Sequence, residues 1–305
     1  MNRFIKGVLA FLLPVLVLGI ILEVLLRKIP NDYKYKSEYL DQHSTAIQTL
    51  YLGNSHIYYG IDPVYLAPNT FNAAYVAQYL NYDLAILQKY NWPALRQIVI
   101  SVDYLSLYGK LEDGVESWRK KNYIIYYGIH LETEIADHME VLSQFKNNLH
   151  KINNYYFQHD KVITCSALGW GTGYTAKTKN DLDETGKQAA IRHTSKDDRN
   201  FNENLQKLKT IIEFAERNKI DVFLITSPAY KTYTDRLNQV QLTRSLNAAK
   251  QLAVNYKNVH YFDLLEDPSF TKADFYDADH LNEKGAKKFT YKTDSLIKAS
   301  VKNQP

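Results

Sequence analysis

The sequence predicts an α/β protein built on a doubly wound, mainly parallel five-stranded sheet. Short apolar runs typical of buried strands alternate with helical patterns, and this alternation favours parallel pairing with helices on both faces of the sheet. Two features lie outside that rhythm: a continuous apolar stretch near the N-terminus, and a Tyr-rich segment at about 110–200 that we expect to be a helical insertion. The clearest apolar runs lie at 49–52, 98–102, 221–226 and 259–263.

The expected elements follow one another in a simple order. The strand at 49–52 is stopped by Gly53, where a parallel strand would pass into a helix. Residues 71–74 predict a strand or turn, and a helical pattern follows them. The run at 98–102 is apolar throughout, which suits a strand covered on both faces. After the insertion, helices are expected at about 202–218 and 236–255, on either side of the strand at 221–226.

Residues 7–26 are almost wholly apolar, and as a helix rising ~1.5 Å per residue they would span about 30 Å, the thickness of a bilayer core. Glu23 lies near the end of this stretch, where water can reach it. A cleaved signal peptide is the main alternative, but the run passes directly into Arg27 without a small-x-small cleavage site. A buried core helix is a weaker alternative. We expect a transmembrane anchor over 1–29, a polar tether over 30–47, and the sheet domain with its insertion over 48–300.

Composition narrows the class of protein. The chain has 305 residues, a net charge of +4 and no long basic run, so nucleic-acid binding is not indicated. Cys165 is the only cysteine, so neither an internal disulfide nor a cysteine-based metal cluster can form. Tyrosine is abundant, with 25 residues. Phenol rings suit sugar-like or amphiphilic partners, although plain packing is the interpretation we prefer.

Two distant segments carry the residues of a possible nucleophilic site. Ser55 directly follows the first strand, at the edge where open α/β sheets place their chemistry. A serine hydroxyl needs a base to take its proton and a carboxylate to orient that base. Asp277 and His280 stand three residues apart before the last helix, so the carboxylate can bond one ring nitrogen while the other faces a serine. Alone, Asp-x-x-His would more often be a solvated loop.

Taken together, the two segments resemble the SGNH or GDSL hydrolase superfamily. Its Gly-Asp-Ser block is matched by Gly53-Asn54-Ser55, and its Asp-x-x-His block by Asp277-Ala278-Asp279-His280, with a His-Leu-Asn-x-x-Gly match through Gly285. The resemblance covers about 48–110 and 200–295, and it implies a flavodoxin-like three-layer sandwich. With its apolar N-terminus and Tyr-rich insertion, the chain looks most like bacterial envelope proteins that handle acyl groups on polysaccharides or teichoic acids.

Carried over residue by residue, the resemblance makes Ser55 the nucleophile, His280 the base and Asp277 the carboxylate that orients it, with no cofactor. Asp279 and Asp274 remain alternative carboxylates. His56 is expected to be a wall residue, because adjacent side chains seldom face the same point.

The middle blocks of the family match poorly, which affects the expected oxyanion hole. The family's glycine is replaced by Asn72-Ala73-Ala74, and its Gly-x-Asn-Asp block by Ser101-Val102-Asp103-Tyr104. An ionised Asp103 can only accept hydrogen bonds. We therefore assign the Ser55 N–H and the Asn72 side chain as oxyanion donors, with turn formation as the alternative role of Asn72. If neither donor serves, the protein would be slow or inactive.

Trp170 and Tyr174 lie among glycines and are candidate substrate-binding residues. They could form a sugar-stacking platform or a lid, with an ordinary hydrophobic plug as the alternative that we prefer. The remaining candidate ligands show no carboxylate or cysteine spacing typical of a metal site, so we predict none. These residues are His130, His138, His150, His159 and His193.

The sequence thus predicts a membrane-anchored SGNH-type serine esterase or O-acyltransferase. It would act on acyl esters of cell-envelope carbohydrate through an acyl-enzyme on Ser55, with a membrane acyl-transfer protein as a possible partner. The alternative is a non-catalytic envelope protein that binds glycan or a partner on a degenerate SGNH fold. A cytoplasmic-facing lipid esterase is a third, weaker hypothesis.

Cues to membrane orientation disagree. Only Arg3 and Lys6 precede the apolar stretch, whereas Arg27, Lys28, Lys34 and Lys36 follow it, and this count favours a cytoplasmic domain. A short basic head before a first apolar segment instead resembles an export signal. Because of the family resemblance, we expect a single-pass protein of the inner (cytoplasmic) membrane with an extracytoplasmic domain.

Overall fold

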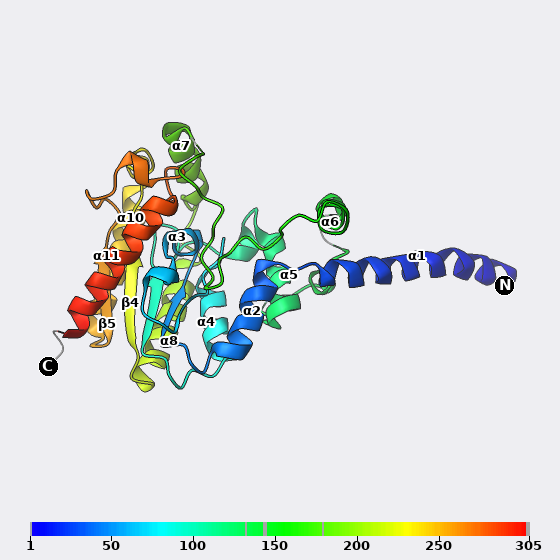
Figure 1. Ribbon diagram of the computed structural model, residues 1–305, viewed down its shortest axis with the longest axis horizontal. Helices are drawn as coiled ribbons and strands as arrows, with labels where there is room; N and C mark the ends of the chain where they lie inside the picture. The colour runs from blue at the N-terminus through cyan, green and yellow to red at the C-terminus, as the bar shows by residue number, and fades with distance from the viewer. Residues whose placement is uncertain (1, 132, 143–144, 179, 303–305) are drawn as a thin grey trace. The chain divides into compact units, whose positions relative to one another are not determined.

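The computed structural model describes residues 2–131, 133–142, 145–178 and 180–302. The chain forms two compact units, each built from two separate stretches of sequence (Figure 1). One unit contains Met1–Glu38 and Val115–Thr164, and the other contains Tyr39–Gly114 and Cys165–Pro305. The second unit holds the sheet and all the residues predicted to carry chemistry.

A five-stranded sheet in the order β2-β1-β3-β4-β5 forms the centre of this second unit, and every pair of neighbouring strands is parallel. The doubly wound parallel sheet predicted from the sequence is therefore confirmed. Its strands are β1 (Thr49–Leu52), β2 (Thr70–Asn72), β3 (Gln97–Ser101), β4 (Asp221–Thr226) and β5 (Val259–Asp263).

The strand order decides which helices cover which face. The chain passes from β1 to β2 at one edge of the sheet. It then returns past β1 to β3 and continues through β4 to β5 at the other edge. Right-handed crossovers then place α3 (Ser55–Gly60) on one face, and α4 (Leu80–Lys89), α8 (Phe201–Arg217) and α10 (Gln239–Asn255) on the other. The contacts agree: α11 (Glu283–Lys302) packs beside α3, α4 packs on α8, and α10 packs on β5.

The core fills both faces of the sheet. On the α3 and α11 face, Tyr51, Val99 and Phe223 pack with Ile57 of α3 and Phe289 of α11. The alternate strand residues are also fully buried, and they include Leu50, Leu52, Ile98, Ile100, Val222 and Leu224. Burial on both faces is the reason that these strands are apolar throughout rather than alternating.

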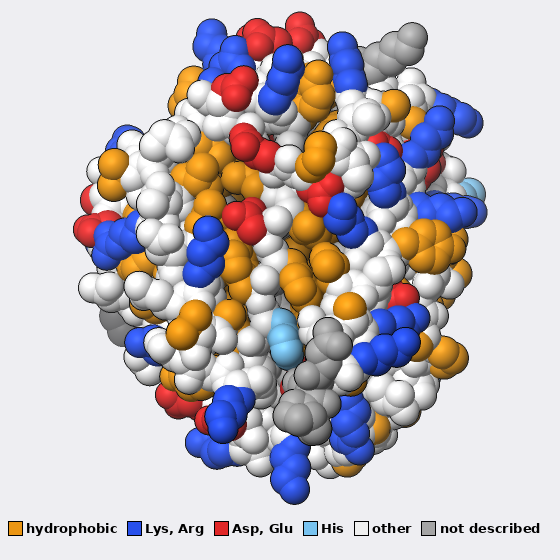
Figure 2. All heavy atoms as spheres, turned by 90° about the vertical axis from the view of Figure 1, so that its left-hand side faces the viewer, with side chains coloured by type: hydrophobic (Ala, Val, Ile, Leu, Met, Phe, Trp, Pro, Cys, Tyr) orange, Lys and Arg blue, Asp and Glu red, His pale blue; other side chains and the backbone are white. Residues whose placement is uncertain are grey.

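The side of the sheet unit at which β5, α10 and α11 lie is seen in Figure 2. On this face the Lys and Arg side chains of the described residues are interspersed with acidic and apolar ones. The surface charge there is mixed, in keeping with the small net charge of +4.

The other unit contains α1 (Asn2–Lys28), whose side chains are exposed along most of its length. Near its end, the Glu23 carboxylate accepts the N–H groups of Glu140 and Val141 at 3.1 and 2.9 Å and pairs with Arg27 at 2.6 Å. Arg27 also donates to the His138 carbonyl at 2.6 Å. The last turns of α1 are thus tied to the 138–141 segment of the same unit.

Two sequence-based boundaries need correction. The segment predicted as a polar tether contains α2 (Asp32–His43), in which Tyr33, Lys36 and Leu40 are buried, so it packs as a helix. The predicted insertion is also divided, because residues 115–164 join the α1 unit whereas the chain from Cys165 joins the sheet unit. Among its described residues, the α-helices are α5 (Lys120–Asn122), α6 (Phe145–Ile152) and α7 (Leu182–His193). Helix α9 (Lys231–Thr234) follows β4.

Candidate active site

Ser55 is held at the carboxyl end of β1 by a strained turn and a helix cap. Gly53 has φ +119°, and a Cβ at this position would lie 2.2 Å from Ser101 Oγ, so the turn requires glycine. The Asn54 side chain accepts the N–H of His56 at 2.9 Å and caps α3. Ser55 is consequently the first residue of α3, where backbone N–H groups have no partner within the helix.

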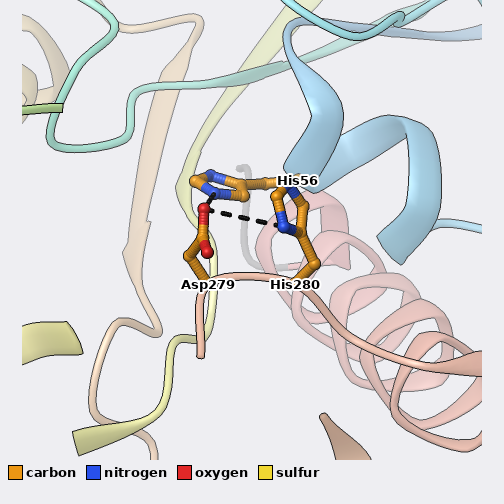
Figure 3. A group of neighbouring side chains, drawn as sticks. All are labelled: His56, Asp279 and His280. Atoms are coloured by element: carbon orange, nitrogen blue, oxygen red, sulfur yellow. Dashed lines mark ion pairs between the residues drawn. The ribbon is translucent and has the colours of Figure 1, made fainter. Parts of the chain in front are cut away.

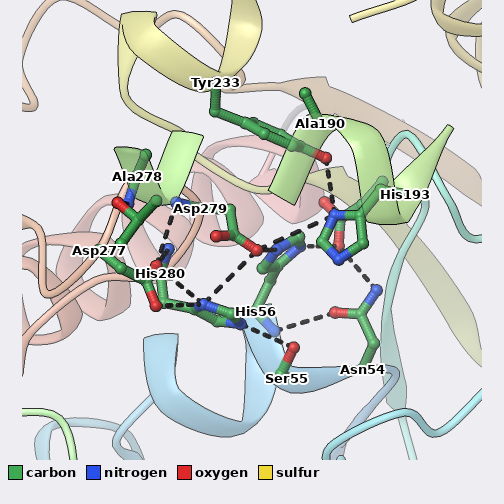
Figure 4. Close-up of polar contacts among 12 residues, drawn as sticks. Asn54, Ser55, His56, Ala190, His193, Tyr233, Asp277, Ala278, Asp279 and His280 are labelled. Carbon is green, nitrogen blue, oxygen red and sulfur yellow. Dashed lines mark hydrogen bonds and ion pairs between the residues drawn. The ribbon is translucent and has the colours of Figure 1, made fainter. Parts of the chain in front are cut away.

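His280 and Asp277 meet Ser55 from the loop before α11 (Figure 4). His280 Nε2 lies 2.8 Å from Ser55 Oγ, and His280 Nδ1 lies 3.0 and 3.2 Å from the two oxygens of Asp277. Asp277 Oδ1 also accepts the N–H groups of Asp279 and His280, at 3.1 and 2.8 Å. The loop therefore fixes the carboxylate and the imidazole against each other, and the structure brings together the three residues that the sequence paired.

The alternative carboxylates have different environments. Asp274 accepts hydrogen bonds from the Thr271 N–H at 2.7 Å and from Lys288 Nζ at 2.5 Å, so its carboxylate serves the loop and α11. Asp279 is closer to the site, with Oδ2 3.6 Å from His280 Nδ1. Asp277 is thus the carboxylate within hydrogen-bond distance of the ring, and Asp279 is its near neighbour.

Asn72 is not available as an oxyanion donor, which corrects the sequence-based assignment. Its Nδ2 donates to the carbonyls of Ile57 and Ile61 at 2.9 and 2.8 Å, and its Oδ1 accepts the Ala74 N–H at 3.1 Å. An amide has two N–H bonds, and both are used here. Asn72 is fully buried and links β2 to α3.

Asp103 is likewise an acceptor, as its replacement of the family's asparagine suggested. Its oxygens accept from the Ser227 N–H at 2.7 Å, from Asn54 Nδ2 at 3.2 Å and from His56 Nδ1 at 2.9 Å. Burial would raise the pKa of Asp103, but His56 and these N–H donors hold it below its usual range. Among the predicted donors, the Ser55 N–H is the one that remains available for an oxyanion.

Tyr174 lies in the middle of an aromatic stack beside the candidate base. Its ring is stacked on Tyr59 at 3.7 Å and on Tyr276 at 3.9 Å between centroids, with interplanar angles of 11° and 8°. The edge of the same stack meets His280, 5.3 Å from Tyr174. Because both ring faces are covered, Tyr174 cannot itself act as the sugar-stacking platform considered from the sequence.

The glycine-rich segment around Trp170 is explained by close packing. Trp170 Nε1 donates to the Tyr59 carbonyl at 2.7 Å, and the ring is half-buried. Gly169 has φ +90°, and a Cβ there would lie 2.1 Å from the Asn72 carbonyl oxygen. The Gly171 N–H donates to the Tyr58 carbonyl at 2.9 Å. The segment therefore needs glycine to pass against α3 and β2, and Trp170 anchors it there.

A second group of buried ionisable side chains lies next to Ser55, His280 and Asp277. Asp279 Oδ2 lies 3.7 Å from His56 Nε2, 3.9 Å from His193 Nδ1 and 3.6 Å from His280 Nδ1. Burial would lower the pKa of His56, but Asp103 first and then Asp279 raise it to about 10. Burial lowers the pKa of His193 to about 3. At neutral pH His56 is therefore a cation, and His193 is neutral.

His56, Asp279 and His280 also have the spacing of potential metal ligands, since one ligand atom of each lies within 4.8 Å of the others (Figure 3). Their chemistry does not favour this role. A doubly protonated His56 offers no lone pair to a metal, and both ring nitrogens of His280 are engaged by Ser55 and Asp277. We assign no metal ligands here.

A cavity of about 420 Å³ is lined in part by His193, whose Nδ1 lies 3.9 Å from Asp279 Oδ2. Its lining is rich in polar and basic side chains, and it includes Arg192, His193, Lys196, Arg199 and Lys110. Neither Ser55 nor His280 lines it. The cavity is thus adjacent to the buried charge cluster and does not contain the candidate nucleophile.

Sequence reasoning missed the partners of His56. The residue was expected to be a wall because it neighbours Ser55, but its ring bonds Asp103 and lies 5.0 Å from the His280 ring. The signal was present in part: Asp103 follows β3, and the carboxyl ends of β1 and β3 meet at the switch point of this strand order. His193, in α7, and the stack with Tyr59 and Tyr276 gave no such signal.

Comparisons with known proteins identify distant structural similarities alone. No family model and no curated protein matches the chain. A candidate platelet activating factor from Streptococcus pneumoniae has 14% identity and a TM-score of 0.46, covering 93% of this chain and 98% of its own. A candidate acylhydrolase from Bacteroides fragilis has 9% identity and a TM-score of 0.38, covering 86% and 97%.

A third solved structure is similar at the same level. A GDSL-like lipase from Bacteroides thetaiotaomicron has 10% identity and a TM-score of 0.36, covering 88% of this chain and 98% of its own. At these identities the function of the chain has to be argued from its own site geometry.

Proposed function

We propose that this chain is an SGNH-type serine hydrolase, an esterase or O-acyltransferase that works through an acyl-enzyme on Ser55. The observation that carries the proposal is the continuous hydrogen-bonded arrangement from Ser55 Oγ to His280 Nε2 at 2.8 Å, and from His280 Nδ1 to Asp277 Oδ1 at 3.0 Å. This is the arrangement of a nucleophile, a general base and the carboxylate that orients the base.

In the first half of the reaction, His280 Nε2 takes the proton of the Ser55 hydroxyl while Oγ forms a bond to the ester carbonyl carbon. The tetrahedral intermediate then collapses, the bond to the leaving alkoxide breaks, and His280 returns the proton to that oxygen. Asp277 holds the imidazole in the tautomer with the proton on Nδ1 and stabilises the imidazolium as it forms. The product of this half is an acyl group on Ser55.

In the second half, water or a carbohydrate hydroxyl attacks the acyl carbon as His280 removes its proton. The bond to Ser55 Oγ breaks, and the proton passes through His280 to Oγ. Water gives a carboxylic acid, and a sugar hydroxyl gives a new ester. No cofactor enters the balance of either half.

The Ser55 N–H is the donor we assign to the developing oxyanion, since the Asn72 amide already donates to the carbonyls of Ile57 and Ile61. A single donor leaves the hole incomplete, and removal of one such donor costs about 10² to 10³ in rate in enzymes that have two. We therefore expect slow hydrolysis of unactivated esters. Activated esters should turn over faster, because their leaving groups depart with less stabilisation from the enzyme.

The test is turnover of an activated acetyl ester together with covalent labelling by a fluorophosphonate probe. Wild-type protein should be labelled on Ser55, and Ser55→Ala should lose labelling and at least about 10³-fold of the turnover. Ser300→Ala, which changes a serine near the end of α11, is the matched control and should behave as wild type. Labelling that persists in Ser55→Ala would remove Ser55 from its role.

A second candidate function is a non-catalytic envelope protein that keeps the fold to bind glycan or a partner. The specific observation in its favour is the incomplete oxyanion hole, in which Asn72 and Asp103 are both committed to structural contacts. Under this alternative, folded wild-type protein would show neither probe labelling nor ester turnover above that of Ser55→Ala.

We further propose that the protein is a single-pass protein of the inner membrane and that its sheet unit is extracytoplasmic. Residues 3–28 form one helix with a mean hydropathy of 2.9 in its most apolar window, long and apolar enough to cross a bilayer. Retention of this helix is supported by Glu23 and Arg27, whose bonds to residues 138–141 would be lost on cleavage. An acylated envelope carbohydrate is the substrate class we propose, with a membrane acyl-transfer protein as a possible partner.

A further inference from the structure

The site contains a second carboxylate–imidazole–carboxylate arrangement, built on the residue next to the candidate nucleophile. His56 Nδ1 lies 2.9 Å from Asp103 Oδ2. His56 Nε2 faces Asp279 Oδ2 at 3.7 Å (Figures 3 and 4). All three residues are buried, with exposed fractions of 7%, 3% and 2% for His56, Asp103 and Asp279. His56 thus joins the loop after β3 to the loop before α11 through the interior.

Geometry and burial determine the charge of this arrangement. Asp103 accepts from three donors, which favours its ionised form. Among the described residues, His56 Nε2 and Asp279 Oδ2 are both buried without a hydrogen-bond partner, and they point at each other. A proton on Nε2 would satisfy both atoms electrostatically, whereas a bare nitrogen facing a bare oxygen would leave both uncompensated.

The charge of Asp279 bears directly on the candidate base. Its Oδ2 lies 3.6 Å from His280 Nδ1, where Asp277 already lies at 3.0 Å. Two carboxylates beside one imidazole favour its protonated form, in which it cannot accept the Ser55 proton. The ring of His56 lies 5.0 Å from that of His280, so a positive charge on His56 opposes the effect of Asp279.

We propose that His56 is a buried, positively charged positioning residue that neutralises Asp279 and so keeps His280 unprotonated and competent as a base at neutral pH. The inference deepens the proposed hydrolase function and rests on it for its catalytic meaning. His56 itself touches neither the Ser55 hydroxyl nor the ester, and acts through Asp279.

Other ionisable groups of the described residues lie around the same cluster, and one of them, Arg192 of α7, is a further cation whose charge acts on His193. From α7, the neutral His193 contacts Tyr233 of α9 at 3.0 Å and Asp279 at 3.9 Å. From α3 and the neighbouring loops, the Tyr59 and Tyr174 rings meet His280 edge-on. Burial, with Tyr59 and Asp277 nearby, raises the pKa of Tyr174 well above its usual range, so this phenol stays neutral.

The test compares two substitutions of opposite charge effect, His56→Gln and Asp279→Asn, in the pH profile of kcat/KM with an activated acetyl ester. Loss of the His56 charge should move the acid limb of the profile to higher pH by about one to two units, and loss of the Asp279 charge should move it to lower pH by a similar amount. The double variant should return close to the wild-type position. A purely structural role would lower the plateau without opposite shifts.

A second readout does not depend on turnover. In the Ser55→Ala background, the Cε1 proton resonance of His280 reports its titration midpoint by NMR. The same opposite displacements are expected there for His56→Gln and Asp279→Asn. If wild-type protein proves inactive but these displacements occur, the hydrolase proposal fails and the electrostatic link stands. If the protein is active but both substitutions move the midpoint in one direction or not at all, the role of His56 is wrong.

Controls protect this test from folding defects. His260→Gln on β5 removes a histidine outside the cluster and should leave both readouts unchanged. Should His56→Gln not fold, Asp103→Asn offers a second route, because His56 without its closest carboxylate should lose its proton. Asp103→Asn should then move the acid limb in the same direction as His56→Gln, and a shift to lower pH would contradict the proposal.

Discussion

At the scale of single residues, the turn before Ser55 depends on a buried carboxyl group. Asp83 is 1% exposed, and its Oδ1 accepts the Gly53 N–H at 2.9 Å and Gln78 Nε2 at 2.7 Å. Burial raises the pKa of Asp83 from 3.8 to about 7, although both hydrogen bonds lower it. At a pH between these two pKa values, Asp83 has released its proton in the unfolded chain but retains it in the folded chain. The contribution to stability is therefore complete below about pH 4 and is lost as pH rises through about 7.

Asp83→Asn should remove this part of the pH dependence, because an amide oxygen can accept the same bonds without titrating. The free energy of unfolding of wild type should fall by an amount on the order of a few kcal/mol more than that of the variant between pH 4 and pH 8. Urea denaturation in detergent at several pH values measures the difference. Asp235→Asn, at an exposed position, is the control, and equal pH dependence in wild type and Asp83→Asn would contradict the prediction.

Asp277 and Asp279 should also be separable by substitution. Asp277 bonds Nδ1 of His280 at 3.0 Å, so Asp277→Asn should reduce kcat by on the order of 10³- to 10⁴-fold by permitting the wrong tautomer. Asp279 lies outside hydrogen-bond distance of His280 Nδ1, so Asp279→Asn should mainly move the pH profile of kcat/KM. The measurement is kcat of each variant at its own pH optimum. A larger loss of kcat for Asp279→Asn than for Asp277→Asn would make Asp279 the carboxylate that orients His280.

At the scale of elements, three segments are joined by one aromatic stack. Tyr59 comes from α3, Tyr174 from the segment after the glycines, and Tyr276 from the loop that bears the candidate carboxylate. In the same loop, the Tyr276 N–H donates a hydrogen bond to the His280 carbonyl at 2.9 Å. The Tyr174 ring is thus placed to hold the loop before α11 against α3.

Tyr174→Leu should therefore loosen the site as well as the fold. Loss of two stacked pairs, at about 0.5–1.5 kcal/mol each, predicts a destabilisation of about 1–3 kcal/mol together with a lower kcat. Tyr174→Phe keeps both ring contacts and serves as the matched control in thermal melts and ester assays. If Leu and Phe variants behave alike, the stack does not position the loop.

At the scale of the whole molecule, the proposed membrane location depends on α1. Most of its large apolar side chains are exposed, and its last turns are bonded within their own unit. Full-length protein should remain in the membrane fraction after an alkaline carbonate wash and should retain its N-terminal residues by intact mass. A soluble product that lacks residues 1–22 would show that the helix is a cleaved signal.

The side of the membrane is a separate prediction. We expect protease added to intact cells with a permeabilised outer layer to digest the sheet unit, because we place that unit outside the inner membrane. A cytoplasmic control protein should survive the same treatment. Digestion that requires lysis of the inner membrane would place the unit in the cytoplasm, as the count of basic residues after the helix favours.

The sequence by itself determined the parallel sheet and its strands at 49–52, 221–226 and 259–263, and it placed β3 one residue late, at 98–102 instead of Gln97–Ser101. Apolar runs are a local property of the chain. The sequence also singled out Ser55, which begins α3 directly after β1, and Asp277 and His280, whose three-residue spacing in the loop before α11 is a local pattern of the chain. It did not find α2, whose mostly polar sequence gives no apolar periodicity although Tyr33, Lys36 and Leu40 are buried. It also misassigned Asn72, because a side chain's partners depend on which distant backbone atoms come within reach.

Only the tertiary structure decided which hydrogen-bonding groups are already committed. Asn72 is occupied by backbone carbonyls, Tyr174 is covered on both faces, and Asp103 and Asp279 enclose His56. Whether a donor is available, or a buried imidazole is charged, follows from partners that are far apart in the sequence and are brought together by the strand order. That is the physical reason why the residue types were evident from the sequence, while the charge behind the candidate base was not.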